Sequence, residues 1–298
     1  MNKTISKKAM LPALLATIGL TACGGGSGDS GNSTESLQGS VSKGLVVGGQ
    51  VDILTSANGE LLAQATTNSN GVFTVELDAM PDVIFVRVTA ASDGSTMMQC
   101  DWSECGATNS QDEDSNNNGV IDFGEWQQVD ESFELTGWIT AEQARQQSFS
   151  INPFTHAAAQ QFSSAPSGSA LDDAYADIQS TFSLYSRPDQ IQVQDVADSS
   201  LDTAQLQDQL MAASVLRVYA PQSSSVEEAL QAVTESNQAV TDISMTDVTN
   251  IVLQAVMTQA SNDDYADMTA SLTEANNEAS EQENRLSNSD LPMLPPLQ

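Results

Sequence analysis

The spacing of apolar residues changes near Thr140, and this change constrains the fold more than any other feature of the sequence. Before Thr140, apolar and polar residues alternate, which is the pattern of a strand with one buried face. The alternating apolar residues are Phe73, Val75 and Leu77, followed by Ile84, Val86 and Val88. After Thr140, apolar residues recur every three or four positions, as on one face of a helix. Two such faces consist of Leu171, Tyr175, Ile178 and Phe182 and of Leu206, Leu210, Ala213, Leu216 and Ala220.

These patterns predict an α+β protein. We expect an N-terminal antiparallel β-sandwich over residues 37–140, with a calcium-loop excursion, and a C-terminal α-helical bundle over residues 141–286. The dipeptides Asn58-Gly59 and Asn70-Gly71 predict tight hairpin turns between strands. A last strand is expected over residues 133–139.

The C-terminal third continues the helical pattern and then loses it. Capping boxes at Ser225 and Ser244 open two further apolar, helix-like segments. Residues 287–298 contain several prolines and few charges, and we expect them to form a disordered Pro-rich tail.

The charge of the chain excludes several functions. Nine Lys and Arg residues stand against 40 Asp and Glu residues, which gives a net charge of −31. A surface this acidic repels phosphate backbones and anionic lipid head groups. We therefore expect no nucleic-acid partner and no membrane attachment through a basic patch. One His and three Cys residues also leave little material for a transition-metal cluster.

Residues 1–22 have the pattern of an export signal, because three lysines precede an apolar stretch that is too short to span a bilayer. The stretch ends in Leu20-Thr21-Ala22-Cys23, which resembles the lipobox of bacterial lipoproteins. That resemblance implies cleavage before Cys23 and acylation of this cysteine, so that several acyl chains anchor the protein in a membrane. The alternative is an ordinary signal peptide that has a cysteine near its cleavage site.

The residues after the lipobox add a location and a tether. Gly24 follows Cys23 and resembles the outer-membrane sorting class, which implies an outer membrane lipoprotein on the periplasmic or the surface-exposed face. Residues 23–36 are rich in Gly and Ser and are expected to form a flexible tether. The partners expected are therefore the membrane, through the lipid anchor, and a protein or glycan at the cell surface.

One group of residues in the β half resembles the carboxypeptidase regulatory-like domain, a small transthyretin-like or Ig-like sandwich of secreted bacterial proteins. The group consists of Gly39, Val41, Val51, Gly59, Thr67, Asn70, Gly71 and Phe73. In that family the module is mostly a structural or binding spacer. The resemblance therefore implies no catalytic residue.

Residues 114–125 match the EF-hand calcium-loop pattern. The expected ligands are Asp114, Asn116, Asn118, the Val120 carbonyl, Asp122 through water, and Glu125 with both oxygens. Oxygen ligands of this number favour Ca²⁺ over softer metals. No amphipathic helix precedes the loop and no second loop pairs with it, so we expect a structural clip rather than a sensor. The alternative is a polar turn without metal.

Cys100 and Cys105 lie in the same excursion as the calcium loop. In an exported protein a local disulfide is the default for such a pair. A redox-active pair or half of a zinc site are the alternatives. The spacing is not Cys-x-x-Cys, however, and His156 is the only imidazole in the chain.

These features predict a calcium-stabilised, lipid-anchored cell-surface protein that acts as a structural, adhesive or binding module and not as an enzyme. A glycan- or peptide-binding accessory subunit of an envelope complex is the first alternative, and its tryptophans would then form a platform instead of filling the core. The tryptophans are Trp102, Trp126 and Trp138. A carboxylate-dependent hydrolase is the least favoured alternative. His156 could serve as a base for Ser148, Ser150 or Thr155, but no nucleophile elbow accompanies it.

The first testable prediction concerns Cys23. Mass spectrometry of the exported protein should find an acylated Cys23 as the first residue, because acylation precedes cleavage in the lipoprotein family. Cys23→Ser should leave an unprocessed or freely soluble protein, since the variant has no thiol to acylate. An unmodified N-terminus at any other residue would contradict the prediction.

Overall fold

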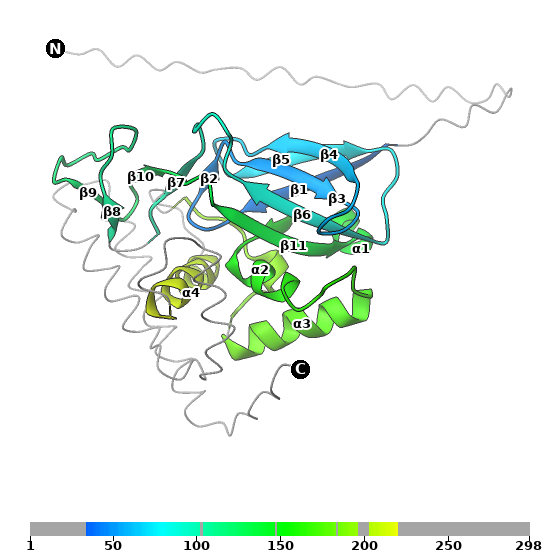
Figure 1. The fold of residues 1–298 in the computed structure, drawn as a ribbon. Helices are drawn as coiled ribbons and strands as arrows, with labels where there is room; N and C mark the ends of the chain where they lie inside the picture. Colours follow the sequence, from blue (N-terminus) through cyan, green and yellow to red (C-terminus); the bar gives the residue numbers. More distant parts are fainter. Residues whose placement is uncertain (1–33, 102–103, 147, 183, 196–202, 220–298) are drawn as a thin grey trace, which may run out of the picture. The chain divides into compact units, whose positions relative to one another are not determined.

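The computed structural model describes residues 34–101, 104–146, 148–182, 184–195 and 203–219. The export signal, Cys23, the expected helices after residue 220 and the Pro-rich tail lie outside these ranges. Within them, several small and mostly antiparallel β-sheets form the N-terminal region, and a few short helices accompany them (Figure 1). None of the helices in these ranges is long and apolar enough to cross a membrane.

The largest sheet has four antiparallel strands in the order β11-β6-β3-β4. Its strands are β3 (Gln50–Leu54), β4 (Leu61–Thr66), β6 (Val83–Thr89) and β11 (Glu134–Thr140). The turn between β3 and β4 contains Asn58-Gly59, and the N–H of Gly59 donates to the carbonyl of Ser56. This hairpin and the strand expected over residues 133–139 are confirmed.

A second sheet has the order β12-β1-β5. It consists of β1 (Glu35–Val41), β5 (Val72–Leu77) and β12 (Phe149–Ile151), with β12 parallel to β1. Because β12 follows the last expected strand, the β structure extends beyond Thr140.

The Asn70-Gly71 turn does not close a hairpin, so that prediction is wrong. It joins β4 to β5, which belong to different sheets. The local turn is present, because the Asn68 side chain accepts the N–H groups of Asn70 and Val72, and Gly71 has a φ of 65°. Turn chemistry fixes the local reversal of the chain, whereas strand pairing depends on tertiary contacts.

The alternating residues predicted for the strands are buried in one hydrophobic core shared by these two sheets. Gly39 of β1 lies where the rings of Phe73 and Phe149 meet edge to face, with their centroids 5.7 Å apart. A Cβ atom at Gly39 would lie only 2.4 Å from Phe73 and 2.9 Å from Phe149. The glycine therefore permits the close packing of these two rings.

The helices lie beside the four-stranded sheet, and α2 packs against β11 (Figure 1). They are α1 (Ala141–Gln146), α2 (Pro153–Ala159), α3 (Gly168–Thr181), the 3-10 helix η1 (Pro188–Gln190) and α4 (Thr203–Tyr219). The predicted face of α3 is buried throughout, and so are Leu206, Leu210 and Ala213 of α4. The side chain of Leu216 and all of Ala220 lie outside the described part.

The excursion between β6 and β11 contributes strands to two small sheets, one of which also contains a strand from the N-terminal part of the chain. One has the order β10-β7-β2 and consists of β2 (Val46–Val47), β7 (Met97–Gln99) and β10 (Trp126–Gln128). The other is a pair formed by β8 (Glu104–Ala107) and β9 (Val120–Asp122). The expected calcium loop begins between β8 and β9 and ends just before β10.

The packing at Gly39 gives the second testable prediction. Gly39→Ala should lower the free energy of unfolding by about 1–3 kcal/mol, because the added methyl group must displace two buried rings. Gly168→Ala at the start of α3 is the matched control, since its Cβ would lie 3.6 Å from Thr140 in ordinary contact. Urea unfolding of both variants checks this, and equal stability of the two would contradict it.

Candidate functional site

Segment 114–125 forms an irregular loop that contains β9 and has no helix on either side. The structure describes every residue from 104 to 146, and the first helix in that range is α1, which begins at Ala141. The flanks therefore differ from those of a helix–loop–helix calcium sensor. Strand β8 pairs with β9 inside the loop, and the two ends of the loop meet where Glu113 pairs with Trp126 of β10.

Asp114 organises the first half of the loop. Its carboxylate accepts the N–H of Gly119 at 2.9 Å and the N–H of Asn118 at 3.3 Å. The hydrogen bond from Gly119 lowers the pKa of Asp114 below its usual value. Gly119 has a φ of 89°, which favours glycine, and no atom lies within 4 Å of the place that a Cβ would take. Asp114 is therefore held as an anion against the turn.

The side chains of Asn116, Asn118 and Asp122 converge. The amide nitrogens of Asn116 and Asn118 donate to the same oxygen of Asp122, at 2.9 Å and 2.7 Å. The amide oxygens of the two asparagines accept the N–H groups of Asn118 and Val120, both at 2.9 Å. Because an amide oxygen has two lone pairs, each retains one for another partner.

Glu125 closes the loop with a carboxylate that is almost completely buried, the residue being 5% exposed. One of its oxygens accepts the N–H of Ser115 at 2.8 Å and also the Ser115 hydroxyl. The other accepts the N–H of Asp122 at 2.9 Å, and the N–H of Glu125 donates to the Asp122 carbonyl at 3.0 Å. These bonds tie the end of the loop to its beginning.

The acidic residues of the loop have no basic partner in the described part of the chain, where the ion pairs of Lys and Arg involve other acids. Those same ranges also contain no group of three or more His, Cys, Asp and Glu side chains that could hold a metal by themselves. An ion at this loop would therefore depend on the two asparagine oxygens and on a backbone carbonyl. Val120 joins the network through its N–H, and only the spacing assigns its carbonyl to an ion.

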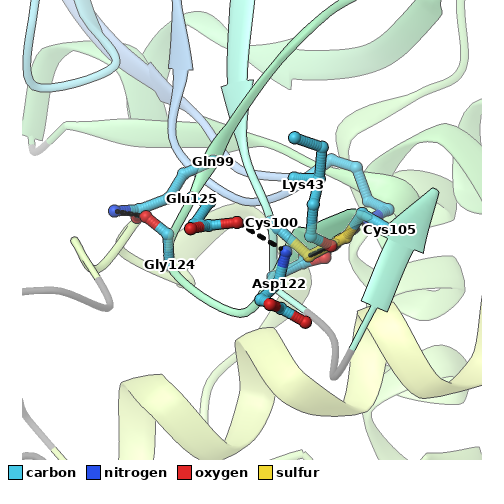
Figure 2. Close-up of a disulfide and its surroundings, with 9 residues drawn as sticks. Lys43, Gln99, Cys100, Cys105, Asp122, Gly124 and Glu125 are labelled. Atoms are coloured by element: carbon cyan, nitrogen blue, oxygen red, sulfur yellow. Dashed lines mark hydrogen bonds and ion pairs between the residues drawn. A yellow bond between two sulfur atoms is a disulfide. The ribbon is translucent and has the colours of Figure 1, made fainter. Parts of the chain in front are cut away.

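The predicted disulfide between Cys100 and Cys105 is confirmed. Cys100 is fully buried, and its backbone contacts the end of the loop. Figure 2 shows the disulfide beside Asp122, Gly124 and Glu125. Sequence reasoning placed the cysteines and the loop in one excursion but did not identify this contact, because the hydrogen-bonded backbones are far apart in the chain.

Two ion pairs that contain a buried aspartate were not predicted from the sequence. Lys43 donates to Asp101 at 2.7 Å, and Asp101 is 1% exposed. Arg187 donates to Asp189 with two nitrogens, and burial raises the pKa of Asp189 although Arg187 opposes the shift. No periodicity marks these residues. Lys43 and Asp101 are brought together by the fold, whereas Arg187 and Asp189 meet across a local Arg-Pro-Asp turn.

His156 is buried in the core. It is 1% exposed, and its Nδ1 accepts the N–H of Thr136 at 3.2 Å. Burial lowers its pKa from 6.5 to about 4. Thr155 donates its hydroxyl to backbone carbonyls, and Ser150 accepts from the Asn152 amide. Thr155 also accepts the N–H of Asn152 and so belongs to the capping box of α2, whereas Ser150 contacts the side chain of the capping residue.

The tryptophans do not form one platform. Trp138 is 1% exposed and packs edge to face on Phe85 with a centroid distance of 4.9 Å. Trp126 is partly buried in β10, and Trp102 lies outside the described residues. Of the two roles considered for Trp138, the structure shows that it fills the core.

Neither a family model, nor a curated protein, nor a solved structure matches this chain. The likenesses of its segments to a lipobox, a regulatory-like module and an EF-hand loop therefore remain predictions based on the sequence.

The burial of His156 gives the third testable prediction. The unfolded chain binds a proton near pH 6.5 that the folded chain excludes until about pH 4, so stability falls as the pH is lowered between these values. Lowering the pH from 7.5 to 5 should cost about 2 kcal/mol through this residue. His156→Asn keeps an acceptor for Thr136 but does not titrate. Between pH 7.5 and 5 the free energy of unfolding of this variant should therefore fall by about 2 kcal/mol less than that of the wild type. Parallel pH profiles in urea unfolding would contradict this.

Proposed function

We propose that loop 114–125 holds one Ca²⁺ and that the protein is a calcium-stabilised, lipid-anchored component of the bacterial envelope. The observation that supports this most is the convergence of Asn116 and Asn118 on Asp122, beside carboxylates that lack a basic partner in the described residues. The protein would act as a structural, adhesive or binding module.

The donor chemistry of the loop fits a hard cation. Asp114, Asp122 and Glu125 are carboxylates, and Asn116 and Asn118 add neutral amide oxygens, each with a free lone pair. A bound ion would supply the positive charge that balances these three carboxylates. Because two of the three leading ligands are neutral and no second loop pairs with this one, we expect a dissociation constant of roughly 10⁻⁴–10⁻³ M.

Beyond the loop, the protein would have the domains and the anchor that the sequence predicts. The sheets β11-β6-β3-β4 and β12-β1-β5 would form the predicted regulatory-like β-sandwich. The helices would continue as a bundle to about residue 286. Acyl chains at Cys23 and the tether 23–36 would hold both at the outer membrane. A binding partner at the surface would be a protein or a glycan.

No observation favours the alternative functions over this one. A glycan- or peptide-binding accessory subunit would need a recognition surface, and the burial of Trp138 removes one member of the expected aromatic platform. A hydrolase that used His156 as its base is disfavoured, because His156 is engaged in the core. A carboxylate-dependent hydrolase would need two carboxylates that converge in an apolar pocket. We therefore propose a role without catalysis.

Calcium should raise the melting temperature of the full-length protein, which is the fourth testable prediction. An ion that binds only the folded state at ten times its dissociation constant adds about 1.4 kcal/mol. For a protein of this size the corresponding rise is about 2–4 °C. Glu125→Gln should lose most of this rise, because it removes the carboxylate that would provide two oxygens.

The matched control for this measurement is Asp130→Asn. Asp130 caps an exposed turn through the N–H of Ser132, and asparagine preserves that bond. Asp112 is less suitable, because its carboxylate accepts the N–H groups of Asn109 and Gln128. Equal melting temperatures of the wild type in several millimolar Ca²⁺ and in chelator would show that the loop is only a turn.

A further inference from the structure

The disulfide joins two segments that hold different parts of the expected calcium loop (Figure 2). Cys100 directly follows β7, whereas Cys105 lies within β8. Strand β7 belongs to the sheet β10-β7-β2, whereas β8 pairs with β9 and with no other strand of the described residues. The covalent bond therefore links the isolated pair β8–β9 to the neighbouring sheet.

Cys100 holds the end of the loop through its backbone. Its N–H donates to the carbonyl of Glu125 at 2.7 Å, and its carbonyl accepts the N–H of Gly124 at 2.9 Å. Cys100 is also fully buried, so these bonds are shielded from water. The position of Glu125 is consequently fixed to that of Cys100.

Cys105 lies beside Asp122, the other acidic residue near the end of the loop (Figure 2). Its neighbours Glu104 and Gly106 pair with Asp122 and Ile121 of β9, with a register shift at Cys105. The disulfide also contacts β9 directly, because the sulfur of Cys100 lies 3.7 Å from the carbonyl oxygen of Ile121. The disulfide thus connects the segment that positions Glu125 with the segment that positions Asp122.

We propose that the disulfide is a redox-dependent positioning element of the calcium site, so that the loop binds Ca²⁺ more tightly when Cys100 and Cys105 are oxidised than when they are reduced. This inference rests on the proposed function. A two-stranded sheet is marginally stable alone. Without the disulfide, β8 and β9 are held to the neighbouring sheet by the turn at residues 122–125, by the pairing of Glu113 with Trp126, and by the bond from the Gln128 N–H to Asp112. The reduced loop must then be ordered at the expense of binding free energy.

The coupling acts in both directions. If oxidation strengthens calcium binding by a given factor, calcium must favour the oxidised form over the reduced form by the same factor. In an oxidising envelope compartment, exchange with a disulfide of another molecule would join the two thiols and release that molecule as a dithiol, so that the site gains its higher affinity after export. The arrangement thus favours calcium binding by the correctly oxidised, exported protein.

The test is calorimetric titration of full-length protein with CaCl₂, comparing the oxidised wild type with the Cys100→Ser/Cys105→Ser variant. We expect the variant to bind at least about fivefold more weakly, at the lower end of typical coupling between sites. Equal affinities would overturn the inference and leave the proposed function intact. Absence of calcium binding by the oxidised wild type would overturn both.

A second measurement needs no cysteine variant and remains informative if the variant does not fold. The wild type is equilibrated in a buffer of reduced and oxidised dithiothreitol, with and without CaCl₂, and the free thiols are alkylated and counted by mass spectrometry. Calcium should lower the equilibrium fraction of free thiols in the wild type and have little effect in Glu125→Gln. An equal fraction with and without calcium in the wild type would contradict the coupling.

Discussion

The carboxylate of Glu125 is nearly buried, and every hydrogen-bond donor that the structure gives it is neutral. Burying a charge is costly unless it is paired or well hydrogen-bonded. The backbone N–H groups of residues 115 and 122 and the Ser115 hydroxyl provide those bonds, and the backbone of Cys100 holds Glu125 in place. The beginning of the loop, its end and the segment after β7 are therefore joined at this one residue.

The longer strands and helices were predictable because their apolar residues are regularly spaced in the sequence. The alternation through β5 and β6 and the stripe on α3 all face the core, as expected. The three residues of β12 were missed, since such a short strand has no recognisable pattern and gains its place by pairing with β1. The turn at Asn70-Gly71 failed as a hairpin for a related reason, because a local signal does not specify the partner strand.

The candidate site shows the same division between local and tertiary information. Spacing alone identified the loop residues, and the export signal made a bond between Cys100 and Cys105 the expected state. The contact between Cys100 and Glu125 could not be predicted, because it joins segments on either side of β8 and β9. The buried pair of Lys43 and Asp101 was missed likewise, since burial of a charged side chain follows only from the assembled fold.

A crystal structure of the oxidised protein grown in several millimolar CaCl₂ tests the central claim most directly. Our account predicts an ion at 2.3–2.6 Å from oxygens of Asp114, Asn116, Asn118, Val120 and Glu125, the range that calcium shows in proteins. Both asparagine amides would then direct oxygen toward the ion. A loop without an ion, in which Asn116 and Asn118 still donate to Asp122, would contradict it.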